Sequence, residues 1–373
     1  MAKCFEPAAL GSLNLKNRFV RSATWEGLAH DDGSCSEELV ALTCELAHGE
    51  IGLIISSHAY VSPEGQAGPG QLAVDHDRVI PPLHSLVEAA HEGGSKIVLQ
   101  LAHAGLQAAR LLTKTEALAP SRIALRGAKL GRAMALGEVE CIIQAFALAA
   151  QRACQAGFDG VQIHAAHGYL LSQFLSPHFN RRKDLYGGSL ENRSRIVLDI
   201  LQRIRAALGR QFTVLIKTNS EDFLKHGSTV EDMLQFAARL EQAGIDGIEL
   251  SGGTNDPASI YHPVRQGTPA VEAEEVYYRA AAQRYKEKIR VPLLLVGGIR
   301  SYSVAAHLIE DGATDFVSLS RPLIREPHLV ARWKAGATNR ATCDSCNLCF
   351  DPIWKGEGVY CVVQENATSW RAS

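Results

Sequence analysis

Short apolar segments recur along the chain, and longer stretches with apolar residues at helical spacing separate them. Each apolar segment has the length and continuity of a strand buried on both faces of a parallel sheet. We predict eight such strands, at residues 19–23, 52–56, 96–101, 160–165, 214–218, 247–251, 292–296 and 316–319. The stretches at 141–156, 191–208 and 233–243 predict helices, and two of them are followed by a glycine, Gly157 or Gly244, before the next strand.

This alternation predicts an α/β protein built on a single (β/α)8 barrel, a TIM barrel, over residues 1–335. No Pro- or Ser-rich linker divides the chain, and the sequence lacks the Gly-x-Gly-x-x-Gly turn that an open doubly wound sheet often carries after its first strand. Three stretches lie outside the repeat. Residues 4–16 predict an N-terminal hairpin that closes the barrel bottom, residues 112–137 a long connection on the active-site face, and residues 336–373 a cysteine-containing C-terminal extension packed on the barrel.

The composition is that of a globular protein and excludes several classes of partner. Hydrophobic residues make up 46% of the chain, which is enough for a full core, and the formal net charge of -2 gives no basic surface for nucleic acid or anionic membranes. No apolar run reaches the roughly 18 to 20 residues of a membrane-spanning helix, and Glu6 and Pro7 stand where a secretory signal would be apolar. We therefore expect a cytoplasmic protein that acts on a small molecule. A homo-oligomer is left open.

Two imidazoles and a phenol follow the predicted strand at 160–165, in the segment His164-Ala-Ala-His167-Gly-Tyr169. Barrel enzymes place their reacting groups at the carboxyl ends of strands. Two ring N–H groups can hold one substrate oxygen, and a phenol can deliver a proton. A pair of structural histidines and a metal site are the alternatives, although the segment itself has no carboxylate or third histidine. We interpret His164, His167 and Tyr169 as a catalytic group.

Two further polar side chains end predicted strands, and both suit a flavin. The amide of Gln100 can donate to and accept from the flavin pyrimidine edge, unless it is simply solvated. The cation of Lys217 can stabilise an anionic reduced flavin, unless it only reaches the barrel rim.

A phosphate site is predicted after the last two strands. The turns there read Val296-Gly-Gly298-Ile-Arg-Ser301 and Ser318-Leu-Ser320-Arg321-Pro322, and each leads into a helical stretch. Free backbone N–H groups, a helix N-terminus and a guanidinium bind phosphate, and TIM barrels often have such a site at this place.

Five motifs between Pro7 and Arg325 are shared with one known enzyme family. They are Leu15-Lys-Asn-Arg18-Phe-Val20, Gln100-Leu-Ala-His-Ala-Gly105, Ile163-His-Ala-Ala-His-Gly-Tyr169, Phe174-Leu-Ser-Pro177 and Asn180-x-Arg182-x-Asp184-x-Tyr-Gly-Gly-Ser189-x-Glu-Asn-Arg193. The chain thereby resembles the Old Yellow Enzyme type of NAD(P)H:flavin oxidoreductases. The resemblance implies an FMN enzyme that takes electrons from NADH or NADPH and reduces activated C=C bonds.

The resemblance also implies a role for each site residue. The residues that would bind FMN are Ala23, Thr24, His58, Gln100, Lys217, Gly298, Ser320 and Arg321. His164 and His167, together with Trp25, would bind the substrate, and Tyr169 would protonate it. NAD(P)H would stack in the same pocket, which fits the missing dinucleotide turn. We interpret the segment 186–193 as structural, with Ser189 capping the next helix and Arg193 pairing with a buried carboxylate.

Two positions depart from the family pattern. Trp25 stands where many members carry a Thr or Cys that bonds the flavin O4, so the redox potential is expected to differ. His58 stands where a small residue is usual, so its ring must point away or narrow the flavin site. A flavin-binding barrel without turnover is the alternative that these departures suggest.

A cysteine motif near the C-terminus, Cys343-x2-Cys346-x2-Cys349-x11-Cys361, holds four of the nine cysteines. It resembles the [4Fe-4S]-binding segment of the dienoyl-CoA reductase and trimethylamine dehydrogenase branch, with one residue fewer between the second and third cysteine. No bound metal, an iron–sulfur cluster and a structural zinc ion are the three alternatives. The second would make the chain an iron–sulfur flavoprotein of the dienoyl reductase type that works with a separate electron-transfer partner. The odd cysteine count favours a reducing compartment.

Overall fold

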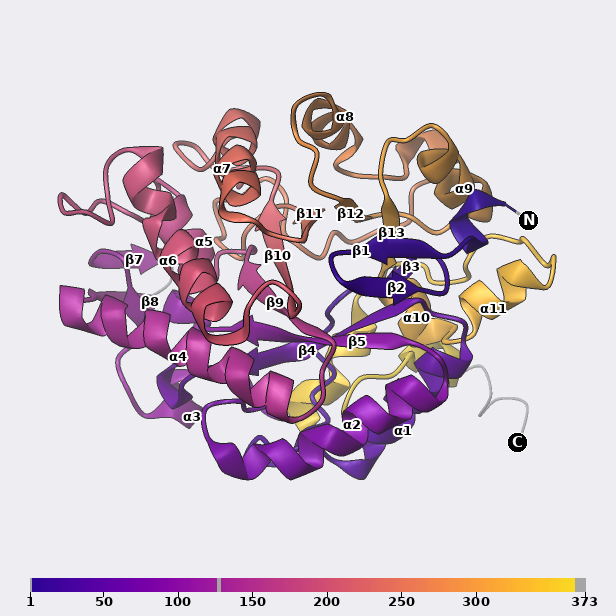
Figure 1. Ribbon diagram of the computed structural model, residues 1–373, viewed down its shortest axis with the longest axis horizontal. Helices are drawn as coiled ribbons and strands as arrows, with labels where there is room; N and C mark the ends of the chain where they lie inside the picture. Colours follow the sequence, from indigo (N-terminus) through magenta and orange to yellow (C-terminus); the bar gives the residue numbers. More distant parts are fainter. Residues whose placement is uncertain (1, 126–128, 366–373) are drawn as a thin grey trace.

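Eight parallel strands close into a barrel in the computed structural model, which describes residues 2–125 and 129–365 (Figure 1). The strands, in order around the barrel, are β3 (Phe19–Arg21), β4 (Leu53–Tyr60), β5 (Lys96–Ala102), β9 (Gly160–Ala165), β10 (Thr213–Asn219), β11 (Gly247–Ser251), β12 (Leu293–Val296) and β13 (Phe316–Leu319), which pairs with β3. Each lies at a predicted apolar segment. The predicted TIM barrel is therefore confirmed.

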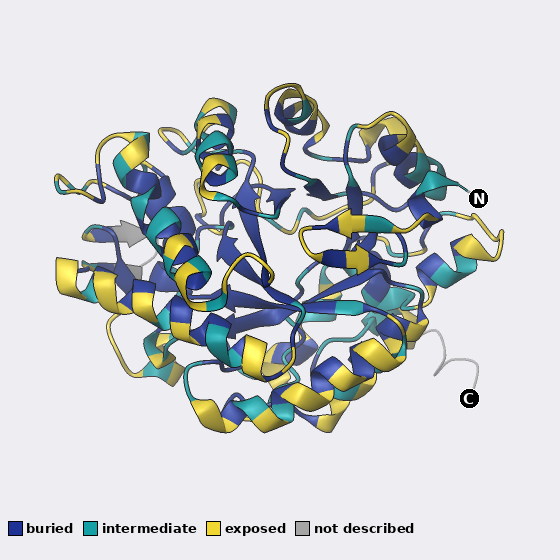
Figure 2. Ribbon diagram, viewed as in Figure 1, coloured by how far each residue is buried: buried dark blue, intermediate teal, exposed yellow. Residues whose placement is uncertain are grey.

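Helices surround the barrel and turn their apolar faces towards it (Figures 1 and 2). They are α1 (Glu37–His48), α2 (Ile80–Glu92), α4 (Leu136–Gln155), α6 (Leu190–Leu208), α7 (Val230–Ala243), α8 (Arg279–Lys288) and α9 (Tyr302–Glu310), with the shorter α3 (Arg110–Thr113), α5 (Leu170–Leu175), α10 (Arg321–Arg325) and α11 (Leu329–Lys334). In α7, Thr229 caps the first turn and Gly244 ends the helix in the left-handed region, at φ 80°. No helix in the described residues is long and apolar enough to cross a membrane.

The N-terminal hairpin closes one end of the barrel. Its strands β1 (Ala8–Leu10) and β2 (Leu13–Leu15) pair antiparallel, and their leucines pack with inward-facing residues such as Val20 and Leu53 in one buried cluster. Because this end is filled with apolar side chains, a ligand has to enter from the other end.

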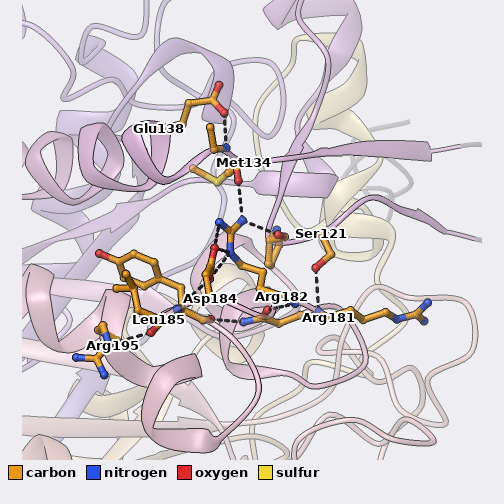
Figure 3. Close-up of polar contacts among 12 residues, drawn as sticks. Ser121, Met134, Glu138, Arg181, Arg182, Asp184, Leu185 and Arg195 are labelled. Atoms are coloured by element: carbon orange, nitrogen blue, oxygen red, sulfur yellow. Dashed lines mark hydrogen bonds and ion pairs between the residues drawn. The ribbon is translucent and has the colours of Figure 1, made fainter.

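The long connection at 112–137 is folded and held by Arg182 (Figure 3). It contains β6 (Leu118–Ala119), β7 (Ile123–Leu125) and β8 (Lys129–Ala133), which form a small sheet, while residues 126–128 lie outside the described part. Arg182 Nη1 donates to the carbonyl oxygens of Pro120 and Met134 at 2.8 and 2.6 Å, and its Nε and Nη2 bind Asp184. Arg182 and Asp184 of the 180–193 motif thus have a structural role.

The segment 186–193 is structural as well. The Ser189 hydroxyl accepts a hydrogen bond from the Asn192 amide at 3.2 Å and so caps α6. Arg193 Nη2 lies 3.2 Å from Asp232 Oδ1, which ties the start of α6 to the start of α7. The predicted helix cap at Ser189 and the predicted ion pair of Arg193 are confirmed. The carboxylate of Asp232 is partly rather than fully buried.

Residues 336–365 of the C-terminal extension pack against the barrel, and residues 366–373 lie outside the described part. Arg300, which follows β12, donates from Nη1 to the Cys343 carbonyl at 2.8 Å and from Nη2 to Ser345 Oγ at 2.6 Å. Further along, the Val359 amide donates to the Glu26 carbonyl at 2.7 Å. The extension is therefore anchored beside the carboxyl ends of the strands.

Candidate active site

A cavity of about 300 Å³ opens at the carboxyl ends of the strands, opposite the hairpin. This volume is at the lower end of the range for small-molecule sites. The residues predicted from the sequence that line it are Ala23, Thr24, Trp25, His58, Gln100, His164, His167, Tyr169, Lys217, Gly298, Ser320 and Arg321. The fold thus brings twelve candidate residues from seven of the eight barrel strands into one site. The four cysteines of the tail lie elsewhere.

The histidines and the tyrosine form a compact group at the end of β9. The His164 ring centroid lies 5.3 Å from that of His167 and 4.9 Å from that of Tyr169. His167 has a positive φ of 63°, and its Nε2 lies 2.8 Å from Ser251 Oγ, so only Nδ1 of this ring is left for a ligand. His164 Nδ1 is buried and has no hydrogen-bond partner among the described residues. Since buried polar atoms are nearly always paired, this nitrogen marks a ligand position.

The protonation states of His164, His167 and Tyr169 follow from their burial. Burial lowers the pKa of His164 and His167 well below the usual value, and the charge of Lys217 lowers both further. Burial raises the pKa of Tyr169. At neutral pH both rings are therefore neutral, each with one N–H donor, and the phenol keeps its proton.

His58 and Trp25, the two positions that depart from the family pattern, are oriented differently relative to the cavity. His58 points inwards, with Nε2 3.2 Å from the Tyr169 hydroxyl, so the ring narrows the site rather than avoiding it. Trp25 instead donates its indole N–H to the Pro69 carbonyl at 3.2 Å, and its ring packs edge-on against Trp354. The Trp25 N–H is therefore directed away from any ligand.

Lys217 is buried in a polar chain that crosses the barrel interior. Its Nζ donates to Ser22 Oγ at 2.8 Å and pairs with Glu249 Oε2 at 3.2 Å. Gln162 joins this carboxylate to Gln100, with bonds of 3.0 and 2.6 Å. The alternative of a lysine at the barrel rim is wrong. The sequence reasoning missed Gln162 and Glu249, although a carboxylate inside an apolar strand segment signals a buried partner.

The predicted phosphate end of the cavity combines a glycine turn with two arginines, Arg300 and Arg321. Gly298 has φ 80°, and a Cβ there would lie 2.6 Å from the Tyr277 ring, so only glycine fits. Arg321 uses Nη1 to bind the Arg265 carbonyl at 2.7 Å and Asn347 Oδ1 at 2.6 Å. These bonds fix the guanidinium. The helix that follows, α10, has only five residues, so the expected helix-dipole contribution is small and the charge of Arg321 dominates.

The four tail cysteines line a second, much smaller cavity, which Arg321 also borders. The pKa of the Cys349 thiol is raised to about 12, mainly by burial. The other three thiols also act to raise this pKa, whereas the charge of Arg321 acts to lower it. All nine cysteines are free thiols. Within residues 2–125 and 129–365, no three His, Cys, Asp or Glu side chains are placed to hold a metal ion. The thiols are thus gathered but do not converge on one point.

Similarity to known proteins extends over nearly the whole chain. A profile of the NADH:flavin oxidoreductase / NADH oxidase family matches residues 3–340. A 4,4'-dithiodibutanoate disulfide reductase from Rhodococcus erythropolis is 33% identical over 97% of this chain and 95% of its own length. An NADH oxidase from Thermoanaerobacter brockii is 35% identical over 97% of this chain and 58% of its own length. A solved 2-naphthoyl-CoA reductase, in complex with 2-naphthoyl-CoA, shares the fold with a TM-score of 0.89 and 25% identity, over 97% of this chain and 56% of that one.

The chain spans nearly the whole of the first of these proteins and little more than half of the other two. The family profile includes every barrel strand and all twelve candidate residues of the cavity. The motifs, the closed barrel and the profile agree, and the chain belongs to the NADH:flavin oxidoreductase / NADH oxidase family.

Proposed function

We propose that the protein is an FMN-dependent NAD(P)H oxidoreductase that reduces activated C=C bonds such as those of enones. One observation carries this proposal. His164, whose buried Nδ1 has no hydrogen-bond partner among the described residues, and the protonated Tyr169 line the same cavity as the fixed Arg321, which lies four strands away around the barrel. Such a cavity offers an oxygen-binding donor, a proton donor and a phosphate-binding cation together.

The residues fit FMN. Arg321 supplies a cation, and Gly298 lines the same cavity with its backbone, as a phosphate site requires. Lys217 supplies a buried cation, and Gln100 an amide whose oxygen is free to accept. FMN bound here would supply, from its N5, the hydride needed to reduce the β-carbon of the substrate.

The chain's own groups handle the substrate oxygen and the proton. A neutral imidazole N–H of His164, joined by His167, binds the carbonyl oxygen and stabilises the negative charge that grows on it. The phenol of Tyr169 gives its proton to the α-carbon. Ser251, which the sequence reasoning missed, holds His167 in place through Nε2.

The proposal predicts that the purified protein binds FMN and turns over. Titration with FMN should saturate at one per chain, and NADPH or NADH should be oxidised steadily only when cyclohexenone is added. Lys217→Met, with Lys225→Met as a control on the surface loop before α7, should weaken FMN binding. Failure of the wild type to bind FMN would overturn the proposal. Binding without NAD(P)H oxidation would instead support a flavin-binding barrel without turnover.

The acceptor class is tested in the same assay. The relative that this chain covers almost completely is named as a reductase of 4,4'-dithiodibutanoate disulfide. A C=C acceptor needs the proton of Tyr169, whereas a disulfide leaves as thiolates that water can protonate. Faster turnover with the disulfide than with cyclohexenone, unaffected by Tyr169→Phe, would place the chain among disulfide reductases.

A second candidate function, an iron–sulfur flavoprotein working with a separate electron-transfer partner, is favoured by the four thiols at one small cavity beside Arg321. Thiolates are the ligands of [4Fe-4S] clusters. If the chain is an iron–sulfur flavoprotein, anaerobically prepared protein should contain about four iron and about four sulfide ions per chain. Cys349→Ser should remove them and Cys141→Ser, at an exposed site on α4, should not. Zinc instead of iron would indicate a structural site, and neither metal would exclude this candidate.

A further inference from the structure

A β-bulge turns His58 into the cavity. β4 pairs with β5 up to Ile55 opposite Val98, and pairing resumes at His58 opposite Gln100, so β4 has one extra residue in between. Ile55 and Val98 face the barrel interior, where they pack with the N-terminal hairpin. In an unbroken strand, alternation would turn Ser57 inwards and His58 towards the outer helices. The bulge reverses this and places His58 beside Gln100 in the cavity lining.

The inward ring meets the phenol. His58 Nε2 lies 3.2 Å from the Tyr169 hydroxyl, and the ring centroids are 5.6 Å apart. His58 is only 7% exposed, and Tyr169 is exposed only in part. The ionisable groups that act on His58 from other elements are Lys217 of β10 and the two histidines at the end of β9. The contact is therefore direct, and solvent hardly screens it.

The protonation of His58 determines what this contact does. Burial, and next the charge of Lys217, lower the pKa of His58 to about 4, so the ring is neutral at neutral pH and has one N–H. If Nε2 lacks the hydrogen, it accepts the phenolic hydrogen and turns it away from the cavity. If Nε2 carries the hydrogen, it donates to the phenol oxygen and leaves the phenolic hydrogen free to point at a substrate.

We propose that His58 is a positioning residue for Tyr169: its Nε2–H donates to the phenol oxygen, aims the phenolic hydrogen into the cavity and holds the phenolate that proton transfer leaves. This inference rests on the proposed function, in which Tyr169 is the proton donor. The phenolic O–H bond breaks, its proton goes to the substrate carbon and its electron pair stays on oxygen. A proton from solvent then restores the phenol, and the His58 ring stays neutral and keeps its Nε2 hydrogen throughout.

The contact is tested without flavin or turnover. In ¹⁵N-labelled protein free of FMN, the long-range ¹⁵N–¹H correlation spectrum reports whether His58 carries its hydrogen on Nε2. We expect an Nε2–H ring in the wild type and a clear shift of the Nε2 signal in Tyr169→Phe. The signals of His103, which is buried outside the cavity, should not move. An Nε2 that lacks its hydrogen, or an Nε2 signal unchanged in Tyr169→Phe, would overturn the proposal.

The catalytic consequence is tested with three variants. His58→Leu should slow the enone-dependent step at least about 10-fold, as expected for one hydrogen bond to a developing charge. His58→Gln, whose amide can still donate, should recover much of the rate. In Tyr169→Phe, His58→Leu should cause little further loss, because both changes remove the same interaction.

FMN affinity and reduction of the flavin by NADPH separate this inference from the proposed function. Normal values for both, with an unchanged enone rate in His58→Leu, would refute the inference alone.

Discussion

Tyr169→Phe is expected to slow the reduction of a weakly activated enone by about 10²- to 10⁴-fold, the usual contribution of a positioned acid. The phenol is held in its protonated form, because burial raises its pKa, and its oxygen lies within hydrogen-bond distance of His58. Phenylalanine keeps the ring and its packing against His164 but cannot give a proton. Rapid-mixing measurements of the two half-reactions should show the loss only in the step with the enone, not in reduction by NADPH.

The acceptor provides a sharp control for this prediction. A nitroalkene stabilises the carbanion left by hydride transfer and needs no proton in the same step, so Tyr169→Phe should lose much less rate with it than with cyclohexenone. Tyr186→Phe, which removes a hydroxyl that bonds Asp199 outside the cavity, should be neutral with both acceptors. Equal losses with both acceptors would point to a distorted cavity, and no loss with either would remove Tyr169 from this role.

The barrel could be predicted from the sequence because its strands are buried on both faces. Such strands are continuous apolar runs, and the polar residue that ends a run marks the carboxyl face of the barrel. His164 and Lys217 were found in this way, and both line the cavity. The hairpin was found because residues 4–16 lie before the first repeat, and its leucines do fill the barrel bottom.

The remaining features depend on pairing that no local pattern contains. Ser-Ser-His in β4 gives no sign of a bulge, because the extra residue exists only relative to β5. The direction of His58 was therefore left open between two possibilities. The buried pair of Lys217 with Glu249 likewise depends on the register between β10 and β11, which places the two residues directly opposite each other. Strand ends can be read from a sequence, but contacts across a barrel need its register.

The connection at 112–137 shows the same limit. Arg182 belonged to a motif that could be recognised, yet its partners are main-chain oxygens 62 and 48 residues earlier in the chain. Carbonyl groups carry no sequence signal. Arg182 could thus be identified from the sequence, whereas its hydrogen bonds to the 112–137 connection could not be predicted.

The free energy of unfolding of the FMN-free protein is expected to fall steeply as the pH drops below about 6.5. Four enclosed histidines have lowered pKa values: His58 and His103, each to about 4, and His164 and His167. Unfolding returns each to an ordinary value near 6.5, so the unfolded chain binds more protons between about pH 6.5 and 4. Each such proton lowers stability by up to about 1.4 kcal/mol per pH unit.

Several carboxyl groups oppose this trend, because burial raises the pKa of Asp199, Glu221 and Asp222 as well as that of Glu26. Burial raises the pKa of Glu26 to about 6, so there the folded state binds the proton first and gains stability as the pH falls. These carboxyl groups offset part of the histidine effect, so the slope stays below the roughly 5.5 kcal/mol per pH unit that four protons would give. Urea unfolding at pH 7.5, 6.5, 5.5 and 4.5 measures this slope.

Histidine variants identify the residues that cause the pH dependence of the free energy of unfolding. His103→Gln, outside the cavity, should flatten it by about one proton, and His84→Gln, at an exposed site on α2, should leave it unchanged. Stability that stays constant from pH 7 to 5 would mean that the cavity histidines take up protons in the folded protein at the same pH as in the unfolded chain. Below about pH 6.5 two adjacent imidazolium rings beside Lys217 would then line the cavity, and the carbonyl-binding role proposed for neutral His164 and His167 would be limited to higher pH.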